Sequence, residues 1–217
     1  SRRGILLTAI LGGLISSTAV TWNYATRSKN TPELSREYSA GILIASAIMF
    51  PRLALLAAIF NITILNYLAV PLTILTLICL VPAILYIKKD SGRAATDIDL
   101  GNPLNILNAL GFAVIYVVIL FAVYYSYAYL GQSGLYYSAL IAGLADTTAI
   151  TINMSKFALE GEQLNLAASV IIAATLSNTL VKLAISFTNG SKAMGRLVGS
   201  IFGGVVLFGL LYILISK

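Results

Sequence analysis

Long hydrophobic stretches dominate the chain, and short polar breaks separate them. Each stretch is long enough for a helix that crosses a bilayer, which needs about 20 apolar residues. Helix punctuation marks the breaks, because Thr31-Pro32 and Asn102-Pro103 each place an N-cap residue before proline. Turn residues follow at Gly131-Gln132-Ser133-Gly134. The pattern predicts an all-α polytopic membrane protein with seven hydrophobic segments, at 4–26, 36–60, 63–87, 103–130, 133–157, 164–188 and 193–216.

The composition agrees with a lipid environment. Of 217 residues, 59% are hydrophobic and 10% are charged, whereas soluble domains carry about 25% charged residues. This balance excludes a soluble domain, a disordered chain and a DNA-binding module. The chain has no histidine, which excludes His-zinc sites and Ser-His catalysis. We therefore expect no enzyme activity, no catalytic residue, no metal centre, no cofactor and no nucleic-acid partner; the partner is the lipid bilayer.

A polar cassette occurs twice along the chain. The first cassette, Gly13–Thr21, reads GLISSTAVT, and the second cassette, Gly143–Thr151, reads GLADTTAIT, 130 residues later. The segments that follow also match, since residues 40–45 correspond to residues 168–173. We interpret the chain as a single membrane domain, 1–217, built from repeat one at 4–88, a linking helix at 103–130 and repeat two at 133–216.

The distribution of basic residues indicates how the two repeats are oriented. If all seven segments cross the membrane, eight basic residues lie on one side and four on the other. If segments 1 and 5 are re-entrant or broken, ten lie on one side and only Lys156 and Lys217 on the other. The positive-inside rule favours the second arrangement, with the ten in the cytoplasm. The repeats are then inverted relative to each other and five segments cross; seven full crossings remain the alternative.

Inverted repeats with interrupted helices are a recurring transporter design, and their binding sites lie near the bilayer midplane. The two cassettes are the candidates for such an ion-binding site, facing each other across the pseudo-two-fold axis. Hydroxyl and carboxylate oxygens suit hard cations better than soft metals. Close helix packing through Ser and Thr is the alternative explanation. The candidate ligands are Ser16, Ser17, Thr18, Thr21, Asp146, Thr147, Thr148 and Thr151.

Asp146 is the carboxylate that lies deep within a hydrophobic segment. Placing an acid there costs roughly 2.5–3.5 kcal/mol on insertion scales, so such residues usually mark an ion path or a proton relay. A structural salt bridge with Lys182 or Arg52 is the alternative. Possible charge partners are therefore Asn178, Lys182 and Arg52, although the two bases are near helix ends and snorkelling also accounts for them.

The cassettes and the stretch Leu176–Lys182 carry a family resemblance. Together they resemble an uncharacterised bacterial and archaeal membrane domain that is commonly found C-terminal to an MgtC/SapB-type domain. The resemblance covers essentially the whole chain. It implies a multi-pass protein of the bacterial or archaeal cell membrane, with an N-terminal MgtC-like region of the same longer chain as a partner. It also leaves open a homo-oligomer or membership of a complex.

These observations lead to two functional hypotheses. The first is a small-ion (cation) transporter or channel, in which the cassettes form the pathway and Asp146 is its charged element. The second is a non-transporting membrane scaffold or regulatory subunit of a larger complex. A polar site at the cassettes is expected from the first hypothesis, and an extensive contact with another chain from the second.

Overall fold

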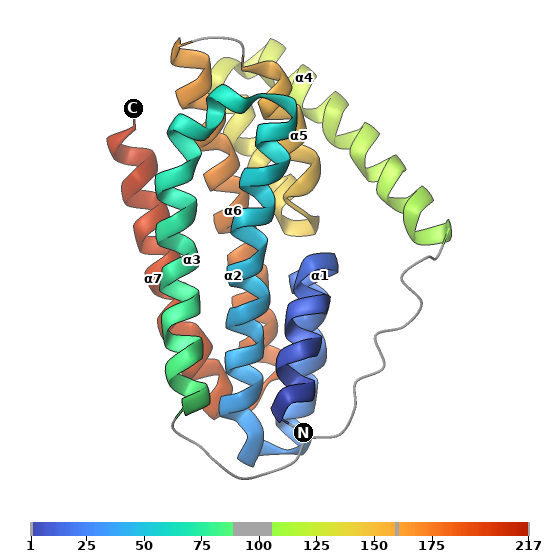
Figure 1. Ribbon diagram of the computed structural model, residues 1–217. Helices are drawn as coiled ribbons and strands as arrows, with labels where there is room; N and C mark the ends of the chain where they lie inside the picture. The colour runs from blue at the N-terminus through green and yellow to red at the C-terminus, as the bar shows by residue number, and fades with distance from the viewer. Residues whose placement is uncertain (1, 89–105, 159–160, 217) are drawn as a thin grey trace. The chain divides into compact units, whose positions relative to one another are not determined.

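The computed structural model describes residues 2–88, 106–158 and 161–216 (Figure 1), and all regular elements in these ranges are helical. The all-α fold class is therefore confirmed. Within the described ranges, seven α-helices and two short 3-10 helices follow one another: α1 (Arg2–Asn30), η1 (Pro32–Leu34), α2 (Ser35–Phe60), η2 (Ile62–Ile64), α3 (Leu65–Lys88), α4 (Ile106–Ala145), α5 (Thr148–Phe157), α6 (Gly161–Asn189) and α7 (Lys192–Ile215).

The predicted segments and the observed helices differ in the middle of the chain. The expected turn at residues 131–134 reduces to one residue, Gly131, whose φ of 58° and ψ of −141° interrupt the helical geometry of α4. Glycine adopts such a φ without steric cost because it has no Cβ. The favoured arrangement takes segment 133–157 as re-entrant or broken, and a break lies within it, since α4 ends at Ala145 and α5 begins at Thr148.

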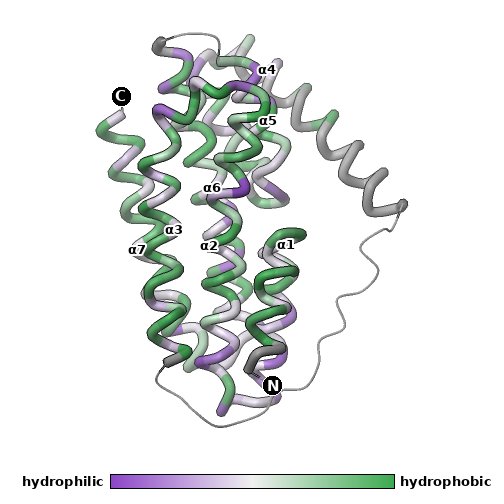
Figure 2. Tube along the Cα trace, in the orientation of Figure 1, coloured by the Kyte–Doolittle hydropathy of each residue, from purple (hydrophilic) through white to green (hydrophobic). Residues whose placement is uncertain are grey.

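Among the described residues, five helical stretches are long and apolar enough to cross a membrane. Figure 2 shows that α3 and α7 are hydrophobic along nearly their whole length, as helices in contact with lipid should be. The predicted linking helix, 103–130, lies partly outside the described residues, and the stretches found do not include it. They are Ile5–Asn30, Pro32–Phe60, Ile62–Ile87, Gln163–Asn189 and Lys192–Ile215.

The chain divides into two compact units, and the divisions fall inside α2, α3, α6 and α7. Unit 1 contains α1, the first two thirds of α2 and the last part of α6. Unit 2 contains α4, α5 and the first part of α6. In full, unit 1 is 1–52, 72–100 and 179–208, and unit 2 is 53–71, 101–178 and 209–217.

In unit 1, α1 is a hairpin of two short helices rather than one straight helix. The backbone leaves helical geometry at Ser16, with φ −156° and ψ 103°, so the 29 residues divide into 14 on either side. The Tyr24 hydroxyl donates to the carbonyl of Ile5 at 2.7 Å, although 19 residues of straight helix would separate the two by about 28 Å. Each arm is about 21 Å long and falls short of a hydrocarbon core of about 30 Å.

The α1 hairpin packs against α2, which runs antiparallel to α6 in this unit. A Cβ added at Gly13 would lie 2.7 Å from Cα of Ala45, so only glycine allows this approach. The Ser35 and Ser191 hydroxyls lie 2.6 Å apart where α2 begins and α6 has just ended. Further along, Ser46 of α2 contacts Lys182 of α6, so the two helices pass each other in opposite directions.

In unit 2, the end of α4 and the whole of α5 form a second broken pair. The two helices contact each other, and residues 146 and 147 separate them. A Cβ at Gly143 would clash with α6, where Cβ of Ser177 would be 2.8 Å away. The Asn61 amide donates to the carbonyl of Ala158 at 2.6 Å and holds the far end of α5. With 10 residues, α5 spans about 15 Å, half of a hydrocarbon core.

Candidate functional site

The break in α1 has polar partners on both sides. Ser16 is the N-cap residue of the second arm of α1, because the Ser16 hydroxyl accepts a hydrogen bond from the backbone N–H of Ala19 at 3.2 Å. On the other side, the Arg52 guanidinium donates to the carbonyls of Leu14 at 2.7 Å and Ile15 at 3.2 Å. These carbonyls end a helix, where intrahelical partners are lacking and a positive charge is favourable. Arg52 therefore stabilises the break, a role that the sequence did not suggest.

Lys182 lies against the first cassette and is fully buried, with 0% of its surface exposed. Its ammonium donates to the hydroxyl of Ser17 at 3.1 Å and to that of Ser46 at 3.4 Å, and the sulfur of Met49 is 3.5 Å away. The Ser17 hydroxyl donates in turn to Met49 Sδ at 3.6 Å. Because its hydrogen points to the sulfur, the lone pairs of the Ser17 oxygen face the ammonium. The snorkelling explanation for Lys182 is wrong, because neighbouring helices enclose the whole side chain.

Asp146 occupies the break between α4 and α5. Its carboxylate oxygen Oδ1 accepts the backbone N–H of Thr148 at 2.5 Å, and its own N–H donates to the carbonyl of Ala142 at 3.0 Å. The carboxylate thus caps α5 at the positive end of that helix. The residue is half-buried.

Two side chains of α6 bind the last carbonyls of α4. The Asn178 amide nitrogen donates to the carbonyl of Gly143 at 3.1 Å, and the Ser177 hydroxyl donates to that of Leu140 at 2.6 Å. In unit 2 these neutral donors do for α4 what Arg52 does for the first arm of α1. The predicted partner Asn178 therefore lies at the same break as Asp146.

Two buried oxygens at this second break have no hydrogen-bond partner among the described residues: Thr147 Oγ1 and Asn178 Oδ1. Only 1% of Thr147 and 3% of Asn178 is exposed. An unsatisfied buried polar atom costs about 1–3 kcal/mol, so each one needs an explanation such as a bound ion or water. This pair of oxygens is the strongest indication of a ligand site in unit 2.

The two breaks resemble each other closely. Residues 11–18 and 141–148 show the same succession of buried, half-buried and exposed positions. The Thr21 hydroxyl donates to the carbonyl of Ser17 at 2.8 Å, and that of Thr151 donates to the carbonyl of Thr147 at 2.8 Å. These two threonines thus bond within their own helices.

The predicted site residues fall into two sets. Unit 1 holds Ser16, Ser17, Thr18 and Thr21 with Arg52 and Lys182, and unit 2 holds Asp146, Thr147, Thr148 and Thr151 with Asn178. Facing cassettes, and a salt bridge between Asp146 and either base, involve both units and stay predictions. Sequence reasoning missed Ser46, Met49 and Ser177. For Ser46 the signal was available, since it is a single hydroxyl within the apolar run at residues 42–50.

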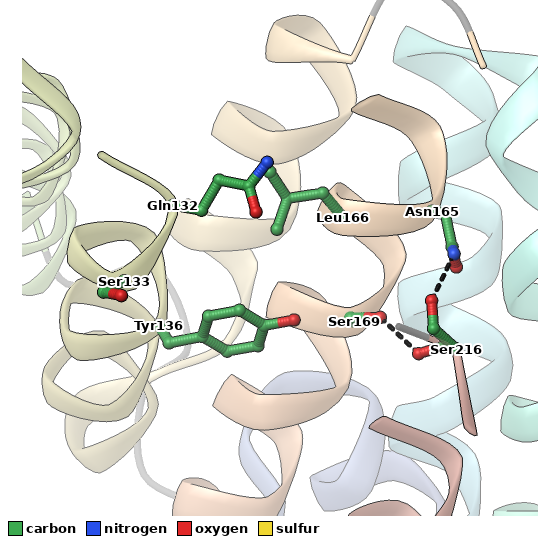
Figure 3. A pocket seen from close by; sticks show the side chains of 7 residues that line it. All are labelled: Gln132, Ser133, Tyr136, Asn165, Leu166, Ser169 and Ser216. Atoms are coloured by element: carbon green, nitrogen blue, oxygen red, sulfur yellow. Dashed lines mark hydrogen bonds between the residues drawn. The ribbon is translucent and has the colours of Figure 1, made fainter. Parts of the chain in front are cut away.

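Unit 2 also contains a polar pocket of about 460 Å³ near the start of α6 (Figure 3). The Tyr136 phenol points toward Ser169, whose hydroxyl lies 2.8 Å from that of Ser216. The Asn165 amide donates to the carbonyl of Ser216. Neutral polar groups dominate the lining, which consists of Gln132, Ser133, Tyr136, Asn165, Leu166, Ser169 and Ser216.

Comparison with known proteins finds relatives of unassigned activity. The family described as "Domain of unknown function (DUF4010)" matches residues 1–190. A protein of Aquifex aeolicus (strain VF5) named "Uncharacterized protein" is 29% identical over 193 residues, which is 88% of this chain and 84% of that protein. No solved structure matches the chain.

Proposed function

The chain belongs to the DUF4010 family, and we propose that it is a membrane protein that binds a small cation at the break between α4 and α5 and moves it across the bilayer. The observation that carries the proposal is the pair of buried oxygens without a partner among the described residues, Thr147 Oγ1 and Asn178 Oδ1. They lie at a helix break that also holds the Asp146 carboxylate. Hydroxyl, amide and carboxylate oxygens are the ligands that hard cations take.

The electrostatics of the break favour a cation. The last carbonyls of α4 form the negative end of that helix, and they point toward the gap before α5. The positive end of α5 would repel a cation, but the Asp146 carboxylate caps it through the Thr148 N–H. One formal negative charge is therefore available next to neutral oxygen ligands. A bound cation would also offset the cost of an acid at membrane depth.

Transport, rather than binding alone, is supported by the two similar helix breaks. Each unit has a broken pair of helices, a close glycine contact to the next long helix and a threonine that bonds to the carbonyl four residues earlier. This similarity supports inverted repeats, whose rocking against each other moves the site between two sides. Basic residues support the orientation, since Arg27, Lys29, Arg36, Lys192 and Arg196 belong to unit 1 and Lys156 to unit 2. The end of unit 1 that carries these five residues would then face the cytoplasm.

The surroundings of the protein form part of the proposal. We place it in a bacterial or archaeal cell membrane, where an MgtC-like region of the same longer chain, or further copies, would be its partners. A scaffold or regulatory subunit without transport is the alternative that the experiment below separates. A scaffold has no need of a cation at the second break.

The test replaces Thr147. Its hydroxyl oxygen has no hydrogen-bond partner among the described residues, so its removal breaks no bond within that part of the protein. Thr147→Val removes the oxygen and keeps the shape, and Thr147→Ser keeps the oxygen. The purified proteins are compared for uptake of sodium, rubidium and magnesium into liposomes, and for the rise in melting temperature that each cation produces. Ser17→Ala, in the first cassette, is the matched control for loss of a cassette hydroxyl.

If a cation binds at this break, Thr147→Val loses cation-dependent stabilisation and uptake at least tenfold, whereas Thr147→Ser retains both. If the oxygen faces only an ordered water or a void, Thr147→Val removes an unsatisfied group and equals or exceeds the wild type in stability. Unchanged uptake in Thr147→Val contradicts the proposed site. Absence of uptake in the wild type contradicts transport and favours the scaffold.

A further inference from the structure

In unit 1, the ammonium group of Lys182 lies at the position that corresponds to the proposed site of unit 2. Ser17 and Thr147 are equivalent, 130 residues apart in the two cassettes, and both are buried, with 5% and 1% of their surfaces exposed. The Ser17 hydroxyl oxygen accepts from the Lys182 ammonium at 3.1 Å. The Thr147 hydroxyl oxygen has no partner among the described residues. The same cassette oxygen thus contacts a positive charge in unit 1, whereas in unit 2 no described residue forms a hydrogen bond with it.

We propose that the Lys182 ammonium is a tethered cation that occupies the unit 1 counterpart of the unit 2 site, and that the ligand of unit 2 is one monovalent alkali cation. This inference rests on the proposed function and adds the class and the number of the ions. It predicts a latent second cation site around Ser17 and Ser46, which becomes available when the ammonium is removed.

The contacts of Lys182 support the equivalence. An ammonium is a compact charge with three donors and no acceptor, so only lone pairs can surround it. The hydroxyls of Ser17 and Ser46 and the thioether of Met49 lie 3.1, 3.4 and 3.5 Å from Nζ. The two hydroxyl oxygens could equally coordinate an alkali cation, because both kinds of ion need electron pairs directed inward. The whole side chain is buried, and Ser17, Ser46 and Met49, which the ammonium contacts, all belong to unit 1.

The charge at the second break distinguishes monovalent from divalent cations. Asp146 supplies one carboxylate, and one of its oxygens already accepts the Thr148 N–H. Thr147 and Asn178 add neutral oxygens. A monovalent ion balances the single negative charge, whereas a divalent ion would leave net positive charge in a buried, low-dielectric place. Magnesium also gives up its hydration water reluctantly and usually keeps several waters.

The experiment counts bound cations in the purified full chain. Radioactive sodium, rubidium and magnesium are measured at saturation for the wild type, for Lys182→Ala and for Lys182→Arg, which keeps the charge. We expect one monovalent cation per wild-type chain, a twofold rise in Lys182→Ala and no rise in Lys182→Arg. The double variant Lys182→Ala with Ser17→Ala should return to the wild-type number.

A second measurement applies if Lys182→Ala is unstable. Its melting temperature is compared in sodium or potassium chloride and in choline chloride at equal ionic strength, and only the alkali ions should restore it toward the wild-type value. An unchanged number of bound ions in Lys182→Ala, without alkali rescue, overturns the tethered cation while leaving the proposed function intact. Binding of magnesium in preference to sodium and rubidium overturns the monovalent class. No cation bound by the wild type overturns the proposed function itself.

Discussion

Replacement of Asp146 separates its capping of α5 from its proposed role as the charge of the cation site. Asp146→Asn keeps an oxygen that can accept the Thr148 N–H, whereas Asp146→Ala removes it. Loss of an N-cap costs about 0.5–2 kcal/mol, and a carboxylate at a helix N-terminus adds roughly 0.3–1 kcal/mol. The expected loss in unfolding free energy is therefore about 1–3 kcal/mol for Asp146→Ala and below about 1 kcal/mol for Asp146→Asn.

The measurement is the melting temperature of the purified protein in detergent, with and without sodium. For a chain of this size, 1 kcal/mol corresponds to about 2–4 °C, so Asp146→Ala should melt roughly 2–12 °C below the wild type. Asp146→Asn should melt close to the wild type without sodium, but should lose most of the stabilisation that sodium gives. Ser16→Ala removes the neutral cap of the other break and is the matched control. It should lower the melting temperature without changing the sodium effect.

Two outcomes would refute this reasoning. If Asp146→Ala melts at the wild-type temperature, the capping interaction contributes nothing and the geometry of the break does not depend on it. If Asp146→Asn retains the full sodium effect, the carboxylate is not a ligand. The second result would remove Asp146 from the cation site even if transport were intact.

Three further predictions follow from contacts in the units. Arg52→Met should lower the unfolding free energy by about 2 kcal/mol, because charged hydrogen bonds to two helix-end carbonyls are lost. Arg52→Lys should recover part of this stability, and thermal unfolding measures both variants. Gly13→Leu should prevent folding through the clash with α2, whereas Gly203→Ala, which has open space, should not; yields of monodisperse protein distinguish them. Cysteines at Lys29 and Lys156 should react with a membrane-impermeant reagent from opposite sides of the membrane, whereas seven full crossings place both on one side, so labelling from one side would contradict the inverted arrangement.

Much of the fold could be predicted from hydrophobic patterning, because helices that meet lipid must be long, apolar and internally hydrogen-bonded. Three of the seven predicted segments, 4–26, 36–60 and 164–188, each lie within one helix, and 63–87 and 193–216 differ from α3 and α7 by only one or two residues at an end. The location of the breaks was also readable, since Ser, Thr and Asp in a hydrophobic segment compete with the helix for backbone hydrogen bonds. The single-residue bend at Gly131 could not be read from the sequence, because four consecutive turn residues do not reveal which one takes the positive φ.

Sequence alone determined the solvent, the helical class, the two cassettes and the candidate residues within them. Only the tertiary structure decided which of these residues interact. Lys182 and Ser17 are 165 residues apart in sequence, and Arg52 reaches helix-end carbonyls 37 and 38 residues away. Local pattern cannot encode such contacts, because they depend on how helices distant in the chain pack. For the same reason, only the tertiary structure reveals that Thr147 Oγ1 and Asn178 Oδ1 have no hydrogen-bond partner in the part of the chain that it describes.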